Sequence, residues 1–379
     1  MTDPRVFASS RKTAEPIDAL GRTSALAHGR LRVLALYIAT AVLVALERAL
    51  SHHMHWTYPV FRESYGHVLA RRDLYAHYPA QGYDLFKYSP TFALLFAPFA
   101  LLPFTPGLVA WDVLNAAALW SALHRLLEPR AAALAALLLY PELVVTLQAS
   151  QSNALVAALI ILAFAALERD RPLGAAAAIG TSAAIKIFPL AALSFALPRN
   201  RRGQMALAML GVGVLLAALP LLVTPPSALL AQYRSWLVIE RADALDHGAS
   251  VMGLASRLAH GRWPNWPIQL AGTAVLLLPL LLRRDRWTDA AFRVRYLCSL
   301  LVYVVIFNHQ AERPSFVIAA AGIVVWWVCS PREAWRTALL VLSLLGLKAA
   351  PCVVAWGVMQ WELLGGTTRA APPARSSPS

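Results

Sequence analysis

Long runs of hydrophobic residues fill most of this chain, and short polar clusters separate the runs. They cover 33–50, 89–104, 108–127, 131–147, 154–167, 173–197, 205–223, 268–282, 294–307, 316–329 and 337–359. A helix that crosses a bilayer needs about 20 apolar residues, so several runs are of marginal length. The pattern predicts an all-α polytopic membrane protein with about 9–12 membrane segments.

The composition agrees with this fold class. Hydrophobic residues make up 58% of the chain and charged residues 14%, and the mean hydropathy is +0.55. These values exceed what a soluble domain needs for its core. The net charge of +14 lies mainly in arginines beside apolar runs, which indicates contact with membrane lipids rather than with nucleic acid. The three cysteines stand far apart and are expected to be small buried hydrophobes.

Arginines crowd one set of connections between the runs, and the positive-inside rule places these connections in the cytoplasm. They are Arg22, Arg30, Arg32, Arg125, Arg130, Arg169, Arg171, Arg199, Arg201, Arg202, Arg283, Arg284, Arg286, Arg332 and Arg336. We therefore expect a cytoplasmic tail over 1–32, one transmembrane domain over 33–360 and a disordered tail over 361–379. The opposite side collects the polar segments 51–87, 148–153, 224–267 and 308–314, of which 51–87 and 224–267 are large external loops. A binding site is expected there, in the plasma (inner) membrane and facing outward.

Two apolar runs do not fit simple spans. The run 89–104 carries three prolines, and a shallow re-entrant or interfacial piece is favoured over a full span because it keeps the later basic loops inside. The run 173–197 lies between two basic loops and is interrupted by Lys186 and Pro189. We expect it to form two half-helices that meet within the membrane.

The first external loop mixes acids, cations and many tyrosines. Aromatic rings, carboxylates and cations together suit a sugar that is joined to a phosphate. The same composition also fits an amphipathic loop at the interface, where tyrosines form an aromatic belt. His52, His53 and His55 have no partner motif for a metal, so no metal site is predicted.

Three further features carry candidate chemistry. A lysine near the bilayer centre is expensive, so Lys186 is expected either to bind a phosphate or to extend its side chain toward the headgroups. Gln151 and Asn153 lie in a polar turn and can bind sugar hydroxyls or cap the following helix. Glu312 and His309 are one helical turn apart, and the alternative for Glu312 is a surface ion pair with Arg313.

Several segments, taken in order, carry a resemblance to a known family. They are DLY at 73–75, KYSPTFALLFAPFALLP from Lys87, SQSNALVAALIILA from Ser150, RPLGAAAAIGTSAAIKIFPL from Arg171 and, more weakly, NHQAERPSF from Asn308. This succession resembles the polyprenol-phosphate-mannose-dependent mannosyltransferases, which are C-type membrane glycosyltransferases of glycosyltransferase family 87. The resemblance covers most of the chain from the first membrane segment to about Arg202. It implies a C-type transmembrane bundle and the inverting transfer of mannose, or a related pentose, from a polyprenyl-phosphate donor to a cell-envelope glycolipid or glycan.

The chain departs from this family at one position. The family usually begins its first external loop with an Asp-Phe pair whose aspartate is the expected base, and that position falls near Thr57 and Tyr58 here. The predicted catalytic residues are therefore Glu63 first, Asp84 second and Glu312 third. The remaining predicted site residues are Lys186, Arg62 and Lys87 for the donor phosphate, and Tyr88, Gln151, Asn153 and His309 for the sugar or acceptor.

No cofactor is predicted beyond the lipid-linked sugar itself. Two other classes stay open: a transporter or flippase of a lipid-linked or amphipathic solute, and a non-catalytic family member that partners another glycosyltransferase. Coupled transporters place ionisable groups within several spans. Here the acids concentrate in the external loops and Asp112 is the main exception, which favours the enzyme.

Overall fold

The computed structural model describes residues 16–51, 57–78, 85–243, 247–261, 263–345 and 349–365, and in 16–28 only the backbone. Every regular element in these residues is a helix, and the apolar helices confirm an all-α polytopic membrane protein. The helix α1 (Pro16–Leu50) begins within the predicted tail 1–32. The last helix, α16 (Ala349–Leu364), extends past the predicted end of the domain at 360.

Except for three in the predicted external loops, at 57–69, 226–242 and 251–259, the other helices fall mostly within the predicted apolar runs. They are α2 (Thr57–Leu69), α3 (Pro90–Leu95), α4 (Ala97–Ala100), α5 (Phe104–Leu126), α6 (Pro129–Gln148), α7 (Asn153–Glu168), α8 (Pro172–Ile185), η2 (Phe188–Ala196), α9 (Arg202–Ala218), η3 (Leu219–Leu222), α10 (Pro226–Ala242), α11 (Val251–Ala259), α12 (Trp266–Leu282), η5 (Arg284–Arg286), α13 (Ala290–Ile306), η6 (Arg313–Ser315), α14 (Phe316–Val328) and α15 (Ala334–Leu344), where η marks a 3₁₀ helix.

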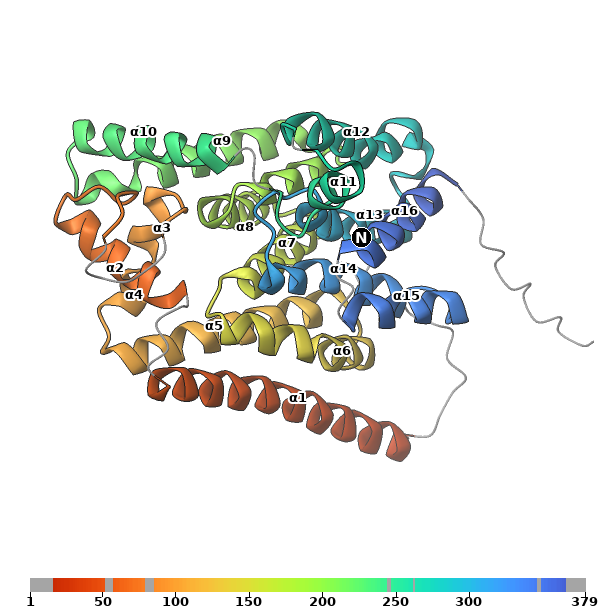
Figure 1. Ribbon diagram of the computed structural model, residues 1–379. Helices are drawn as coiled ribbons and strands as arrows, with labels where there is room; N and C mark the ends of the chain where they lie inside the picture. The colour runs from red at the N-terminus through yellow and green to blue at the C-terminus, as the bar shows by residue number, and fades with distance from the viewer. Residues whose placement is uncertain are drawn as a thin grey trace, which may run out of the picture.

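The centre of the bundle is formed by helices that are largely apolar. Most side chains of α7 and α13 and nearly all of those of α14 are buried, as expected of helices that other helices surround. Gly322 lets α13 and α14 approach closely, since a Cβ at this position would lie 2.5 Å from the Cys298 carbonyl oxygen. In Figure 1, α1 runs along the lower edge beneath α5 and α6, while α2, α3, α4 and α10 gather at the left end.

Among the residues that the structure describes, three helices are long and apolar enough to cross a bilayer by length and composition: Gly29–Leu50, Pro129–Gln148 and Arg202–Leu222. Shorter apolar helices of 10–17 residues include α7, α8, α12 and α16. The span that contains α9 is only 11% buried, so most of its surface lies on the outside of the bundle. The central helices, in contrast, contact mainly other helices.

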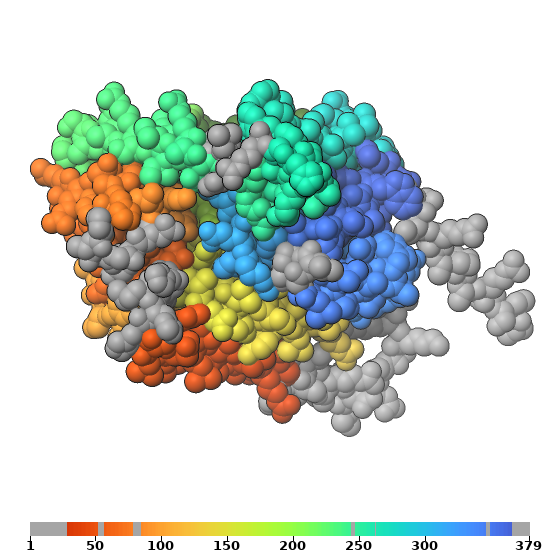
Figure 2. All heavy atoms as spheres, in the orientation of Figure 1, coloured from red at the N-terminus to blue at the C-terminus, as the bar shows by residue number. Residues whose placement is uncertain are grey.

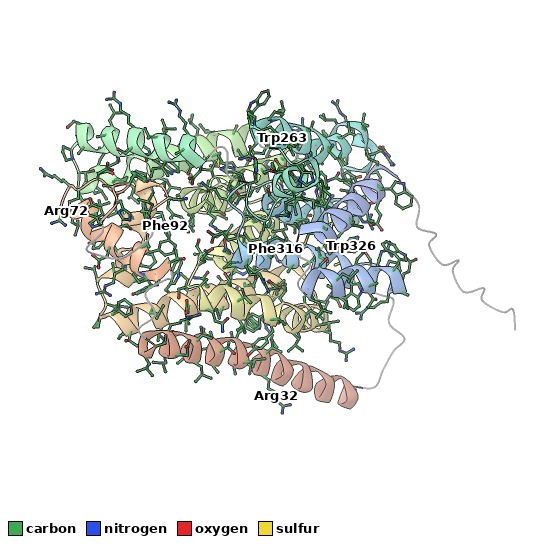
Figure 3. The ribbon with its side chains drawn as sticks, in the orientation of Figure 1. Arg32, Arg72, Phe92, Trp263, Phe316 and Trp326 are labelled. Atoms are coloured by element: carbon green, nitrogen blue, oxygen red, sulfur yellow. The ribbon has the colours of Figure 1, made fainter. Side chains whose placement is uncertain are left out.

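The segment 89–104 is too short in helix to cross a membrane, as its prolines suggested. It forms α3 of six residues and α4 of four residues, joined at Phe96. Ser89 caps α3 by accepting a hydrogen bond from Phe92 N, and its hydroxyl donates to the Ala184 carbonyl oxygen at the end of α8. These contacts hold α3 against the end of α8, and Phe92 lies within the molecule in Figure 3.

The segment 173–197 divides at Lys186, which confirms the predicted pair of half-helices. The helix α8 ends at Ile185, Lys186 is extended with φ −140° and ψ 137°, and η2 begins at Phe188. Pro189 in the first turn of η2 cannot continue α8, because its ring would clash with the carbonyl four residues earlier. The break therefore follows directly from the local sequence.

The prediction of one membrane segment over 337–359 is wrong. The structure has two helices there, α15 and α16, and Arg336 at the start of α15 pairs with Glu362 near the end of α16. The two helices are therefore antiparallel, and each is too short for an ordinary span. Pro351 explains the difference, since a proline is tolerated in the first turn of α16 but would break a continuous helix.

The arginine-rich connections lie together at one side of the bundle. Arg169 Nη2 donates to the Arg125 carbonyl oxygen at 3.1 Å, and the Arg202 guanidinium lies 4.9 Å from the centre of the Trp287 ring. Arg283 Nη1 donates to the Leu364 carbonyl oxygen at 2.8 Å, which brings the end of α16 to the same side. We call this side the basic face.

Glu362 joins the antiparallel helices α15 and α16 to the rest of the bundle, and its loss is expected to destabilise the fold. This buried carboxylate accepts hydrogen bonds from Arg336 and from Trp326 Nε1, and pairs with Arg295. Breaking a buried ion pair from one side typically costs about 3 kcal/mol or more. Glu362→Gln is therefore expected to lower the Tm of the purified protein in detergent. Asp285→Asn, which removes the exposed partner of Arg283, is the matched control and should leave the Tm unchanged.

Candidate functional site

A cavity of about 970 Å³ opens at the end of the bundle away from the basic face. Its walls come from the four polar segments, which are distant in sequence, together with the break around Lys186 and with Gln269 on α12. Its lining includes Thr57, Lys87, Tyr88, Gln151, Lys186, Phe188, Trp236, Glu240, His247, Gln269, His309 and Glu312. Figure 2 shows the orange first loop adjoining the green α10 on the face drawn.

Backbone and side-chain contacts fix the four polar segments to one another. Thr57 N donates to the Ala149 carbonyl oxygen at 3.3 Å, and Ala249 N donates to the Ala311 carbonyl oxygen at 2.8 Å. Gln232 on α10 donates to the Arg72 carbonyl oxygen at 2.8 Å, and Arg72 projects from the end of the bundle that carries the first loop in Figure 3. The polar segments that the sequence placed on one side therefore surround one chamber.

Lys186 faces this chamber from the break between α8 and η2. Its Nζ donates to Asn153 Oδ1 at 2.7 Å. Asn153 Nδ2 donates to Gln151 Oε1 at 2.5 Å, and Gln151 Nε2 donates to Glu312 Oε2 at 2.8 Å. Four of the predicted site residues thus form one continuous hydrogen-bonded chain.

Glu312 is exposed to the cavity rather than paired at the surface. Arg313 turns away from it and binds Glu142 on α6 through both Nη atoms, at 2.5 Å and 3.0 Å. The interpretation of Glu312 as a surface ion pair with Arg313 is therefore wrong. The Glu312 side chain also belongs to a capping box with Ser315, which fixes its place at the start of η6.

The other cavity residues from the prediction occupy different parts of the wall. His309 Nδ1 lies 3.2 Å from Gln269 Nε2, and the His309 ring meets Phe188 edge to face. Tyr88 packs edge to face on Phe61, with ring centres 4.8 Å apart. Lys87 forms an ion pair with Asp243 at 2.8 Å, so a carboxylate already engages its ammonium group.

Two predicted residues lie outside the cavity, and a third lies outside the described residues. Glu63 sits one turn beyond Val60 on α2 and lines a separate small hollow with His67. Arg62 donates to the Leu102 carbonyl oxygen at 2.8 Å and stacks on Phe104. Asp84 is the one outside the described residues. The cavity therefore gives no support to Glu63 as the base or to Arg62 as a phosphate ligand.

The sequence reasoning missed two acids at the end of α10. Glu240 lines the cavity, and Asp243 joins Lys87 to Gln310, whose Nε2 donates to Asp243 at 3.0 Å. Burial raises the pKa of the Glu240 carboxyl above its usual value, and the nearby Asp243 charge adds to this effect. The two acids are three residues apart on an amphipathic helix, which was the available signal.

Thr57, near which the resemblance places the family's aspartate, lines the cavity. Its backbone contact with Ala149 places it beside the turn that holds Gln151, and Gln151 binds Glu312. A carboxylate therefore lies close to the position of the missing one, although it comes from a distant part of the chain.

Metal-binding residues are not grouped in the part of the chain that the structure describes. Within those residues, no set of three or more His, Cys, Asp or Glu side chains is placed to hold a metal ion. His52, His53 and His55 lie outside the described residues.

The bundle and its cavity define a polytopic membrane protein with a charged chamber at one end. Residues 86–308 match glycosyltransferase family 87, which is more than half of the chain. The protein therefore belongs to glycosyltransferase family 87. No curated protein matched the chain. The matched region contains Lys87, Gln151, Asn153 and Lys186, and it ends at Asn308, just before His309 and Glu312.

Proposed function

We propose that this membrane glycosyltransferase moves a sugar from a polyprenyl-phosphate donor to a hydroxyl of a glycolipid or glycan acceptor, with inversion. Membership of the family supports sugar transfer in general. The choice of mannose or a related pentose, and a C-type arrangement of the bundle, follow from the resemblance. The lipid-linked donor has support of its own in the shape of the molecule.

The observation that carries the lipid-linked donor is an apolar path that begins beside Lys186. Ile187, Leu190 and Leu193 are 41%, 39% and 37% exposed along η2. Leu193 also lines a groove of about 560 Å³ between η2 and the outward-facing α9, and nearly all of the other side chains in this groove are apolar. A phosphate held by Lys186 could therefore carry a polyprenyl tail directly into the lipid. A nucleotide sugar has no group that would use such a path.

The proposed reaction uses Glu312 and Lys186. Glu312 takes the proton of the acceptor hydroxyl as that oxygen attacks the anomeric carbon of the donor sugar. The new glycosidic bond forms as the bond from the anomeric carbon to the phosphate oxygen breaks, and the leaving group is polyprenyl phosphate. Lys186 stabilises the negative charge that grows on this phosphate. We propose that no metal or organic cofactor takes part.

Other cavity residues have supporting roles in this proposal. Tyr88 and His309 offer ring surfaces to the sugar or acceptor. Lys87 is a second candidate phosphate ligand, but it would have to exchange Asp243 for the phosphate.

We further propose that the protein resides in the cell's inner (plasma) membrane with this cavity on the outer side. The basic face lies at the other end of the bundle, and arginine-rich connections favour the cytoplasm. Nucleotide sugars are cytoplasmic, so an outward cavity would need a lipid carrier.

Transfer by the purified protein in liposomes tests this function. The assay supplies a synthetic polyprenyl-phosphate sugar and a glycolipid acceptor, and measures labelled product. A nucleotide sugar is the matched control donor and should give no product. Movement of the lipid across the bilayer without transfer would instead support a flippase, and neither activity would support a non-catalytic family member.

A further inference from the structure

The chain of hydrogen bonds between Lys186 and Glu312 has a fixed direction. Each amide donates with its nitrogen toward Glu312 and accepts with its oxygen from the side of Lys186. Lysine can only donate, and an ionised carboxylate can only accept. The arrangement therefore matches a charged lysine at one end and an ionised carboxylate at the other.

The two amides are held in place by their surroundings. Asn153 is fully buried at the start of α7, and Gln151 is 9% exposed in the turn before it. The Ser150 carbonyl oxygen in the same turn accepts a hydrogen bond from Trp111 Nε1 on α5 at 2.9 Å. A turn fixed in this way restricts the orientations open to both amides.

We propose that Asn153 and Gln151 are positioning residues that couple donor binding at Lys186 to the orientation of Glu312. This role rests on the proposed function and differs from the sugar contacts expected of these residues. One N–H of the Lys186 ammonium binds Asn153, which leaves two for the donor phosphate. A donor phosphate that binds the Lys186 ammonium restricts its orientation, and therefore also the orientation of the Asn153 and Gln151 amides. Because Gln151 binds Glu312, the carboxylate that receives the acceptor proton is oriented as well.

A double-mutant cycle on donor affinity tests this coupling. Glu312→Ala removes the acceptor end of the bridge and is expected to weaken binding of a polyprenyl-phosphate sugar about fivefold. In a Gln151→Met background the same substitution should leave donor affinity unchanged, because the bridge is already broken. Glu312→Gln should keep the affinity, since the introduced amide oxygen can still accept from Gln151. The readout is the Kd of a labelled donor for the purified protein in detergent.

Gln310→Met is the matched control, because Gln310 lines the same cavity but binds Asp243. In that background Glu312→Ala should retain its effect of about fivefold. If Gln151→Met does not yield folded protein, Asn153→Leu breaks the same bridge one step earlier and should give the same result. Independent effects of Glu312→Ala and Gln151→Met on donor affinity would overturn the coupling. Such a result would leave the proposed function intact, since that depends on transfer in liposomes.

Discussion

Glu312→Gln is expected to reduce the turnover number about a thousandfold while the protein still binds its donor. The substitution keeps the shape of the side chain and its contact with Gln151, but the amide cannot take a proton from the acceptor hydroxyl. General base catalysis typically contributes about 10²–10⁴ in rate, so the loss should fall in kcat rather than in donor affinity. The measurement is the initial rate of sugar transfer at saturating donor and acceptor, together with the donor Kd.

The control for this prediction is Glu63→Gln, because Glu63 is also a partly buried glutamate near the cavity but lines a separate hollow. It should retain more than half of the transfer rate. Full activity in Glu312→Gln would exclude Glu312 as the base. Loss of activity in Glu63→Gln, with normal folding, would return that role to the first loop.

The sequence predicted features of the fold that local chemistry determines. The break at Lys186 follows from a charged residue and a proline within one apolar run. The basic face follows from arginines that cannot enter the hydrocarbon. The run 337–359 was predicted as one segment because it is apolar throughout. Pro351 permits two short helices there but not one long helix.

The choice among acids could not be made from the sequence, because it depends on how distant segments pack. Glu63 is the acid nearest the family's aspartate in sequence, yet the cavity ends at Val60 on the same helix. Glu312 is about 250 residues from Thr57, yet it lines the same cavity and accepts a hydrogen bond from Gln151 there. The ion pair of Lys87 with Asp243 likewise joins segments that have no local relation. Spacing within one helix carries no information on such contacts.

The partnership of Gln151 and Asn153 was also ambiguous in the sequence. Polar residues before a helix commonly act as caps, but Ser152 at the cap position of α7 makes no side-chain cap hydrogen bond. The neighbouring amides instead bind Lys186 and Glu312. Their role became visible only when the break after α8 and the segment before α14 were placed around the same turn.

Lys186→Met is expected to weaken donor binding by about two orders of magnitude, and also to slow transfer. The ammonium binds the phosphate in the ground state and stabilises its growing charge during the reaction, and loss of one such group typically costs about 10²–10³ in rate. Methionine fills the space of the lysine stem without its charge, so the break between α8 and η2, which Pro189 imposes, should persist. The donor Kd and the single-turnover rate separate the two effects.

Arg62→Met is the matched control, because Arg62 binds a backbone carbonyl outside the cavity. This variant should bind donor normally. Unchanged donor affinity in Lys186→Met would exclude Lys186 as the phosphate ligand, and Lys87 would then be the remaining candidate.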